Sequence, residues 1–237
     1  MDTAAISGIK KTAKACAYVR EQLAKWIRPG VTTLEIDSQA VNFIKETGAV
    51  SAVLGRNNFP GHICICLDEE VAHYSGGNRL VNEGDLVKID VSLRYEGWVA
   101  DCAETIYLGS DERLRSLVEA NKSAIIETAQ CLCPGLPLRD ISAVIDSQKG
   151  SFYFFDELTG HGTGPSLHCQ PILPSFRDDS LSGKTKTGQI LAIEAVYGLV
   201  ASELQFVDNL RINSNGLNCH HEETIMITAN GCNILTR

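Results

Sequence analysis

Two aspartates occur in a stretch of the chain that otherwise reads as β-structure. Asp90 and Asp101 lie eleven residues apart and are separated by a Glu-Gly pair that suits a hairpin turn. If Tyr95 pairs with Trp98 across this turn, the two aspartates become diagonal neighbours on one face, roughly 7 Å apart between their backbones. Carboxylates at that separation can reach a pair of cations roughly 3.5–4 Å apart. The alternative is an exposed face on which both aspartates meet water.

Two histidines stand among glycines further along the chain. His161 and His168 belong to the segment Thr-Gly-His-Gly-Thr-Gly-Pro-Ser-Leu-His. Glycines next to a ligand allow the backbone to pass close to a metal or a substrate, and histidine is the commonest metal ligand. A single histidine is more often structural, but two in a glycine-rich segment favour a functional site.

Three glutamates in the last part of the chain complete the candidate set. Glu194 stands in the apolar segment Ile-Leu-Ala-Ile-Glu-Ala-Val-Tyr, where a cation or an arginine must compensate its charge. Glu222 and Glu223 open a later strand-like segment, and the alternation of side chains sends them to opposite faces. Only one of the two can point toward a shared site, and the spacing does not decide which.

The elements that must position these residues follow a pattern that occurs twice. Apolar residues at helical spacing predict helices near 4–27 and 32–48, and again near 111–131 and 138–148, each pair broken by Pro-Gly. Strands are predicted near 49–54, 62–67, 86–95 and 98–107, and then near 151–155, 166–173, 190–200, 206–212 and 219–228. This pattern predicts an α+β fold with two half-repeats, approximately 4–110 and 111–237, in a single domain spanning 1–237. The alternative is chance, because Pro-Gly before a helix is common in mixed proteins.

Composition narrows the class of protein. The chain has 237 residues, 44% of them hydrophobic and 21% charged, which is typical of a globular protein. Its net charge of −8 argues against nucleic acid and anionic membranes as partners. There is no secretory signal pattern at the N-terminus and no apolar run of about 18 residues. The nine cysteines, an odd number without a Cys-x-x-Cys motif, indicate a reducing compartment, and we expect a cytoplasmic protein.

The candidate residues together resemble a known family. The pattern consists of Asp90 and Asp101, His161-Gly-x-Gly-x-x-x-His168-x-x-Pro, Ile193-Glu194 and Glu222-x-Thr-Ile. It is similar to the methionine aminopeptidases of type I, the short bacterial class of the pita-bread metallopeptidases, and the similarity runs from the first helix to the last strand. The resemblance implies a pita-bread fold, in which a pseudo-two-fold pair of helix–helix–strand halves surrounds a curved antiparallel sheet.

Carried over residue by residue, the resemblance implies a dinuclear metal centre. Two divalent metal ions (Mn, Co, Fe or Zn) would be held by Asp90, Asp101, His161, Glu194 and Glu222. Asp101 and Glu222 would bridge the two ions. The resemblance selects Glu222 over Glu223, because the family's ligand stands two residues before the Thr-Ile pair.

The resemblance also implies a reaction, the metal-assisted hydrolysis of the first peptide bond of a peptide or nascent protein. Glu194 would shuttle a proton from water to the leaving amine, and His168 would stabilise the oxyanion. His73 would contact the substrate backbone. The residue removed would be methionine, and we expect the enzyme to act as a monomer.

The substrate pocket implied by the resemblance departs from the family's pattern. Its positions match Phe59, Cys64, Leu167 and Leu210, with Arg56 near the mouth. Leu167 and Leu210 stand where the family usually has large aromatic residues, which widens the pocket. His73 is followed by Tyr-Ser-Gly-Gly in place of Gly-Ile-Pro, and Glu194 by Ala-Val in place of Pro-Met.

Two other functions are compatible with the same fold. A Xaa-Pro peptidase of the same fold would usually carry an additional N-terminal domain, for which this chain has no counterpart. A non-catalytic pita-bread module that binds a peptide or a protein would typically lose metal ligands, and all five are present here.

Overall fold

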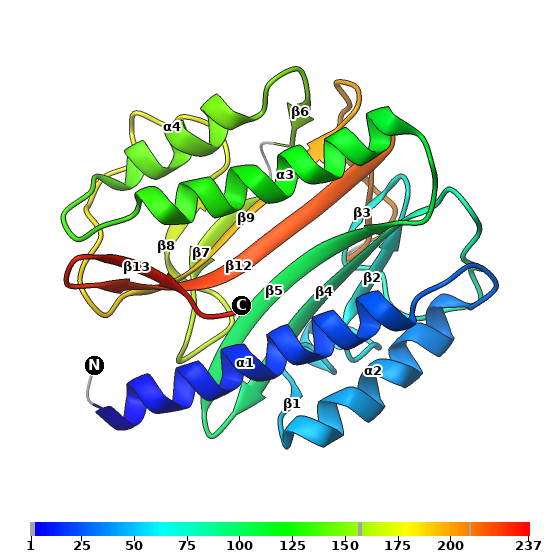
Figure 1. Cartoon of the computed structure of the whole chain (residues 1–237), viewed down its shortest axis with the longest axis horizontal. Helices are drawn as coiled ribbons and strands as arrows, with labels where there is room; N and C mark the ends of the chain where they lie inside the picture. The colour runs from blue at the N-terminus through cyan, green and yellow to red at the C-terminus, as the bar shows by residue number, and fades with distance from the viewer. Residues whose placement is uncertain (1–2, 156–157, 209) are drawn as a thin grey trace.

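The α-helices come in two pairs in the part of the chain that the structure describes. The computed structural model describes residues 3–155, 158–208 and 210–237. The first pair is α1 (Thr3–Trp26) and α2 (Thr33–Thr47), and the second is α3 (Glu112–Cys131) and α4 (Leu138–Gln148). Both pairs lie on the same side of the sheet, one over each half (Figure 1). The helices predicted from periodicity are confirmed, and their ends differ by at most one residue.

Local sequence explains where these helices begin and end. Thr32 caps α2 by accepting a hydrogen bond from the backbone of Glu35, whose carboxylate accepts one from the backbone of Thr32 in return. Gly48 ends α2 in the left-handed conformation, with φ of 73°, which an L-residue with a Cβ rarely adopts. Asp111 caps α3 by accepting from the backbones of Arg113 and Leu114.

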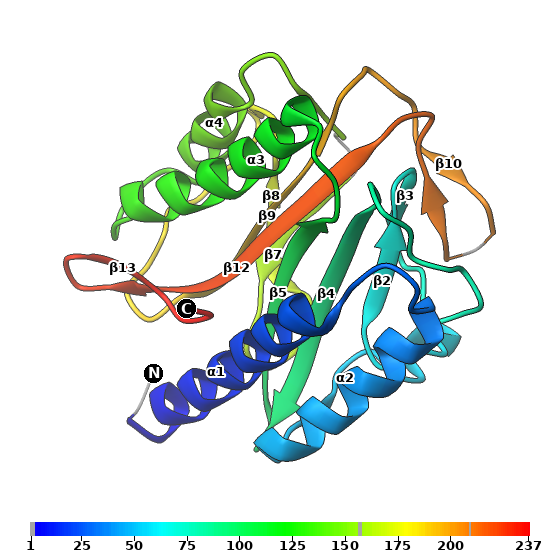
Figure 2. The same cartoon turned by 45° about the vertical axis from the view of Figure 1, so that its right-hand side comes forward.

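The strands form one large antiparallel sheet and one small one. The large sheet runs in the order β1–β4–β5–β12–β9–β7–β8, with β2 beside β4, β6 beside β9 and β13 beside β12, and the small sheet runs β10–β11–β3. β12 lies next to β5 in the middle, where the two halves of the chain meet (Figure 2). The bounds are β1 (Val50–Ser51), β2 (Cys64–Leu67), β3 (Glu70–Ala72), β4 (Leu86–Tyr95), β5 (Trp98–Tyr107), β6 (Tyr153–Phe154), β7 (Thr159–Gly162), β8 (Cys169–Pro174), β9 (Ile190–Gly198), β10 (Gln205–Phe206), β11 (Ile212–Asn213), β12 (Asn218–Thr228) and β13 (Gly231–Ile234). The α+β class predicted from the sequence is confirmed.

One predicted strand is wrong. The sequence favours a continuous strand near 206–212, but β10 ends at Phe206 and the next strand begins only at Ile212. Between them the carboxylate of Asp208 accepts hydrogen bonds from the backbone N–H groups of Leu210 and Arg211, at 2.8 and 2.7 Å. Aspartate that bonds the backbone two or three residues ahead favours a turn, and this local preference overrides the strand propensity of Phe206, Val207 and Ile212. Residue 209 lies outside the described residues.

The hairpin register that the sequence predicts is confirmed. Tyr95 lies opposite Trp98, and Ser92 lies opposite Asp101. Asp90 lies opposite Ala103, so both aspartates project from the same face of β4 and β5. The two carboxylates therefore reach a common side of the sheet.

The two faces of the large sheet have different contents. The helices cover a face built from apolar side chains, which include Ile89 and Cys102 beneath α1 and α2 and Ile193 and Ile225 beneath α3 and α4. The residues that alternate with these, Asp90 among them, point to the other face. None of the helices in the described ranges has both the length and the hydrophobicity needed to span a bilayer.

Glu223 lies on the helix side, where it is compensated by cations. It is fully buried, and its carboxylate lies 3.2 Å from the guanidinium of Arg20 and 3.1 Å from Nε2 of His221. Burial alone would raise the pKa of Glu223, but the hydrogen bond from His221 and the charge of Arg20 outweigh it and hold the pKa at about 2. Strand alternation therefore leaves only Glu222 to face away from the helices.

Replacing Glu223 by glutamine tests this buried network. Because E223Q removes the closest carboxylate from the buried Arg20, which then keeps only Glu104 at 4.0 Å, we expect the free energy of unfolding at pH 7 to fall by about 3–5 kcal/mol. The pKa in the folded state lies below the unfolded value of about 4.3, so the contribution of Glu223 is present above pH 4.3 and is lost as the pH falls toward 2. Urea unfolding at pH 7 and at pH 3 measures both effects. A stability difference that is absent, or equal at the two pH values, contradicts this account.

Candidate metal centre

Acidic side chains line up across four adjacent strands. Asp90 in β4 lies opposite Ala103 in β5, Ala103 lies opposite Glu222 in β12, and Glu222 lies opposite Glu194 in β9. Three carboxylates thus form one row, interrupted only by the small side chain of Ala103. Like charges directly opposite one another in a sheet are destabilising. This row needs a compensating positive charge.

Asp101 and His161 add to the row from either side. Atoms of Asp101, His161 and Glu222 that can bind a metal all lie within 4.8 Å of one another, and the three side chains are buried. The carboxylate of Asp101 accepts a hydrogen bond of 2.8 Å from Ser92 Oγ. Its backbone is fixed by Thr224, whose Oγ1 accepts from the N–H and donates to the carbonyl of Asp101. The position of this carboxylate is therefore determined by two strands.

The tautomer of His161 leaves its Nε2 atom as an acceptor. Its Nδ1 lies 3.0 Å from the carbonyl oxygen of Gly162, and since a carbonyl only accepts, Nδ1 carries the proton. Nε2 is left with a lone pair, and it lies 4.0 Å from Oε1 of both Glu194 and Glu222. Three lone-pair atoms therefore face one another, namely this nitrogen and the two carboxylate oxygens. A cation shared by the three atoms would stabilise this arrangement.

The electrostatics of the carboxylates support the same interpretation. Burial raises the pKa of Asp90 well above its usual value, and the charge of Asp101 raises it further. Burial likewise raises the pKa of Glu222, assisted by Asp101 and Glu194. Oδ1 of Asp90 and Oε1 of Glu222 are buried and have no hydrogen-bond partner. The donor set fits divalent cations, because their charge would offset the cost of burying these carboxylates so close together.

The five residues predicted as metal ligands surround one cavity of about 340 Å³. His73 and His168 line the same cavity, and the rings of His161 and His168 meet edge to face with centroids 4.5 Å apart. Nδ1 of His168 lies 3.4 Å from the guanidinium of Arg56, which can only donate, so the proton of His168 is on Nε2. Nδ1 of His73 lies 3.0 Å from the carbonyl of Leu210 and carries the proton, which leaves Nε2 as an acceptor. The two histidines therefore offer opposite hydrogen-bonding roles.

The residues predicted for the substrate pocket also lie together. A second cavity of about 170 Å³ adjoins the first, and Asp90, Asp101, His73 and His168 line both. Its wall also includes all the predicted pocket residues, which are Phe59, Cys64, Leu167, Leu210 and Arg56, and Cys64 lines the first cavity too. Phe59, Cys64 and Leu167 are buried, so the wall is largely apolar.

Sequence reasoning missed two cationic or potentially cationic residues that line the larger cavity. His220 precedes Glu222 by two residues in β12, and its Nε2 lies 3.0 Å from Oε2 of Glu194. Lys88 precedes Asp90 by two residues in β4, is buried, and donates to the backbone carbonyls of Asp68 and Asn218. Burial lowers the pKa of Lys88 to about 8. Strand alternation counted back from the two acidic residues would have placed both on the inner face.

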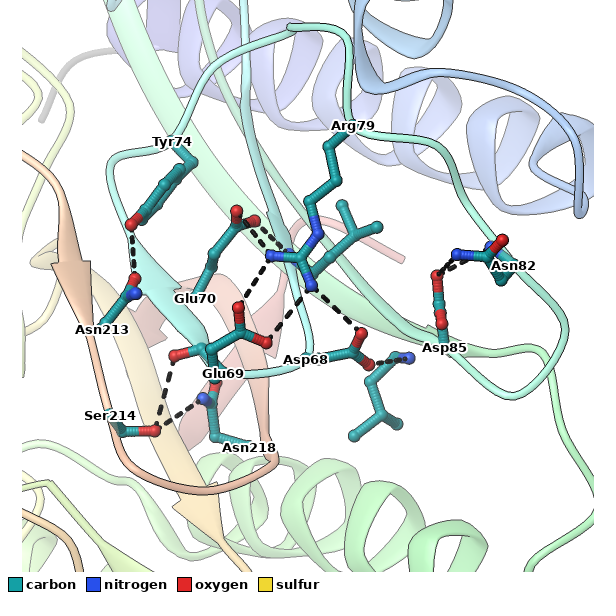
Figure 3. A network of polar contacts seen from close by, with 12 residues as sticks. Asp68, Glu69, Glu70, Tyr74, Arg79, Asn82, Asp85, Asn213, Ser214 and Asn218 are labelled. Atoms are coloured by element: carbon teal, nitrogen blue, oxygen red, sulfur yellow. Dashed lines mark hydrogen bonds and ion pairs between the residues drawn. The ribbon is translucent and has the colours of Figure 1, made fainter.

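A separate acidic cluster near the cavity is already compensated. Asp68, Glu69 and Glu70 all pair with the guanidinium of Arg79, at distances of 3.3, 3.0 and 2.7 Å (Figure 3). Glu70 also accepts a hydrogen bond from the backbone of Leu67. This cluster fixes the turn and strand that lead to His73, and its charges do not call for a metal.

Removing and restoring metal tests the donor set. We expect Mn²⁺ or Co²⁺, added to chelator-treated protein at 100 times Kd, to stabilise the fold by about 2.7 kcal/mol, or roughly 5–10 °C in melting temperature. E222Q is the matched control, since it removes the carboxylate opposite Glu194. We expect metal-free E222Q to melt above the metal-free unmodified protein and to gain less from metal. Equal gains in both proteins, or no gain with Mn, Co, Fe or Zn, would count against this donor set.

Comparisons with known proteins agree with this geometry. Residues 7–229 match metallopeptidase family M24. Methionine aminopeptidase 1 of Bacillus subtilis is 33% identical over 236 residues, which cover 97% of this chain and 95% of that protein. The structure of methionine aminopeptidase from Thermotoga maritima is 28% identical with a TM-score of 0.95, covering 100% of this chain and 98% of that one. A prolidase from Pyrococcus furiosus has a TM-score of 0.79 at 21% identity, and this chain covers 64% of it, so this likeness concerns the fold alone.

The resemblance inferred from the sequence, the pita-bread architecture and the divalent-metal cofactor are thereby confirmed. The substrates of this protein are the N-termini of peptides or proteins. The chain belongs to metallopeptidase family M24 and is a metallo-aminopeptidase.

Proposed function

We propose that this enzyme removes the N-terminal methionine from peptides or nascent proteins. The observation that carries the proposal is the convergence of the acidic row and His161 on a cavity that opens into an apolar pocket. The relatives with the highest similarity reported above are named methionine aminopeptidases. An apolar pocket beside a hydrolytic centre suits the unbranched thioether side chain of methionine.

Five residues would hold the metal ions, namely Asp90, Asp101, His161, Glu194 and Glu222. When bound, a pair of divalent cations lowers the pKa of water and polarises the carbonyl of the scissile bond. Asp101, Glu222 and His161 would act together in holding the ions, because their ligand atoms all lie within 4.8 Å of one another. The remaining carboxylates, those of Asp90 and Glu194, stand at opposite ends of the row.

Glu194 would move the proton during hydrolysis. Burial alone would raise the pKa of Glu194, but the hydrogen bond from His220 and the nearby His161 outweigh it and lower the pKa. The carboxylate is therefore ionised near neutral pH and can accept a proton from the attacking water. It would then deliver that proton to the leaving amine.

His168 and His73 would bind the substrate through opposite hydrogen bonds. With its proton on Nε2, His168 can donate to the carbonyl oxygen of the scissile bond, where negative charge develops. Burial and the neighbouring His161 lower the pKa of His168, so the ring is neutral at pH 7. With its proton on Nδ1, His73 can accept a hydrogen bond at Nε2 from an N–H group of the substrate backbone.

The cellular setting belongs to the same proposal. All nine cysteines carry free thiols, which suits the reducing cytoplasm. The net charge of −8 favours neither nucleic acid nor an anionic membrane as a partner, and we propose that the protein acts as a monomer. We further propose that residues 1–237 act as one catalytic domain with half-repeats 4–110 and 111–237. The repeated order of two helices followed by strands supports this division.

Replacing Glu194 by glutamine tests the proton shuttle. The amide has nearly the same shape but cannot accept the proton, so we expect kcat to fall by about 10²–10⁴-fold. Steady-state kinetics with Met-Ala-Ser should be run together with elemental analysis of the same sample. Near-normal turnover by E194Q with metal retained would remove Glu194 from this role.

A peptide panel tests the substrate class. With Mn²⁺ or Co²⁺ added, we expect release of methionine from Met-Ala-Ser and no cleavage of Ala-Pro or of other peptides with proline in second place. Preferred cleavage of the proline peptides would indicate a Xaa-Pro peptidase. No cleavage with any metal would indicate a peptide-binding module.

A further inference from the structure

Glu194 is held between two imidazoles that contact different oxygens of its carboxylate. Nε2 of His220 lies 3.0 Å from Oε2, whereas Nε2 of His161 lies 4.0 Å from Oε1. Because a carboxylate only accepts, the 3.0 Å contact requires that His220 carry its proton on Nε2. His161 has its proton on Nδ1, bonded to Gly162, and cannot donate to Glu194. One oxygen of Glu194 thus has a donor, and the other faces the cluster without one.

We propose that His220 is a positioning residue for the metal centre. Its Nε2–H fixes Oε2 of Glu194 and so keeps Oε1 facing Nε2 of His161, where both atoms would be available to hold a metal ion. The inference rests on the proposed function, since it takes Glu194 as a metal ligand.

The backbone of His220 is itself fixed by the neighbouring strand. Its N–H donates to Thr105 Oγ1 at 2.8 Å, and Thr105 Oγ1 donates back to the carbonyl of His220 at 2.9 Å. Thr105 is buried, and so is His220. In the register of β12 and β9 His220 lies opposite Val196, which makes Glu194 its diagonal neighbour on the same face. The donor is therefore held in place before any metal binds.

The hydrogen bond from His220 counteracts repulsion between Glu194 and Glu222. Glu194 stands directly opposite Glu222, so repulsion between the two carboxylates would drive the side chain of Glu194 away from the cluster. The hydrogen bond from His220 opposes this movement and stabilises the ionised form. Hydrogen bonds to metal-binding carboxylates of this kind affect metal affinity or activity by roughly 10–100-fold.

Two variants that differ by one methylene test the inference. H220Q places an amide N–H near the position of Nε2, whereas the shorter H220N cannot reach Oε2 of Glu194. We expect H220N to weaken the tighter Mn²⁺ site roughly 10–100-fold in a calorimetric titration and to alter the visible spectrum of the Co²⁺-loaded protein. H220Q should keep most of the affinity and the spectrum of the unmodified protein.

The neighbouring histidine supplies a matched control. His221 lies in the same strand but contacts Glu223 on the helix side, so H221Q should lower the melting temperature and leave Mn²⁺ affinity unchanged. Unchanged Mn²⁺ affinity in H220N would overturn the inference. Equal losses of affinity in H220Q and H220N would also overturn it, because a ligand role or a general structural role would then fit better.

A parallel titration of E194Q separates this inference from the function on which it rests. If E194Q binds Mn²⁺ as tightly as the unmodified protein, Glu194 is no ligand and the proposed metal centre fails. If E194Q binds weakly while H220N binds normally, only the role of His220 fails. Should H220N not fold, loss of affinity in folded H220Q still overturns the positioning role.

Discussion

Repulsion among buried carboxylates is the constraint on which the rest of the structure depends. Asp90, Glu222 and Glu194 stand in one row across four strands, and Asp101 joins them from the hairpin. Two of their oxygens are buried without a hydrogen-bond partner. A folded chain tolerates this concentration of negative charge only with protons or metal ions between the groups. The catalytic class of the enzyme follows from that requirement.

The surrounding structure separates the roles of similar side chains. In β12 the neighbouring Glu222 and Glu223 face opposite sides of the sheet, one toward the cavity and the other toward Arg20 and α1. The histidines differ in tautomer. Nδ1–H of His161 and of His73 each donates a hydrogen bond to a backbone carbonyl, whereas Nδ1 of His168 accepts one from Arg56. Backbone groups and one arginine thus decide which nitrogen is available to a metal or a substrate.

Periodicity predicts the parts of this molecule that are long and regular. The four helices and the β4–β5 hairpin, including the pairing of Ser92 with Asp101, follow from sequence alone. The strands β3, β7 and β13 have only three or four residues, too few to show an alternation. β7 and β13 pair with longer neighbours, whereas β3 pairs with the two-residue strand β11. Asp208 forms a turn in the segment 206–212, for which the sequence predicts one strand.

For the candidate site, strand alternation shows that Glu222 and Glu223 diverge, but only family resemblance or coordinates select Glu222. The contact between His220 and Glu194 joins residues 26 positions apart, and it depends on the register of β12 against β9. A pattern within one segment carries no information about that register.

Anomalous diffraction from crystals grown with Mn²⁺ would locate the ions among these carboxylates. We expect two peaks, roughly 3.5–4 Å apart, among Asp90, Asp101, His161, Glu194 and Glu222. Peaks only at the Arg79-bound acidic cluster, or none between these five side chains, would contradict this expectation.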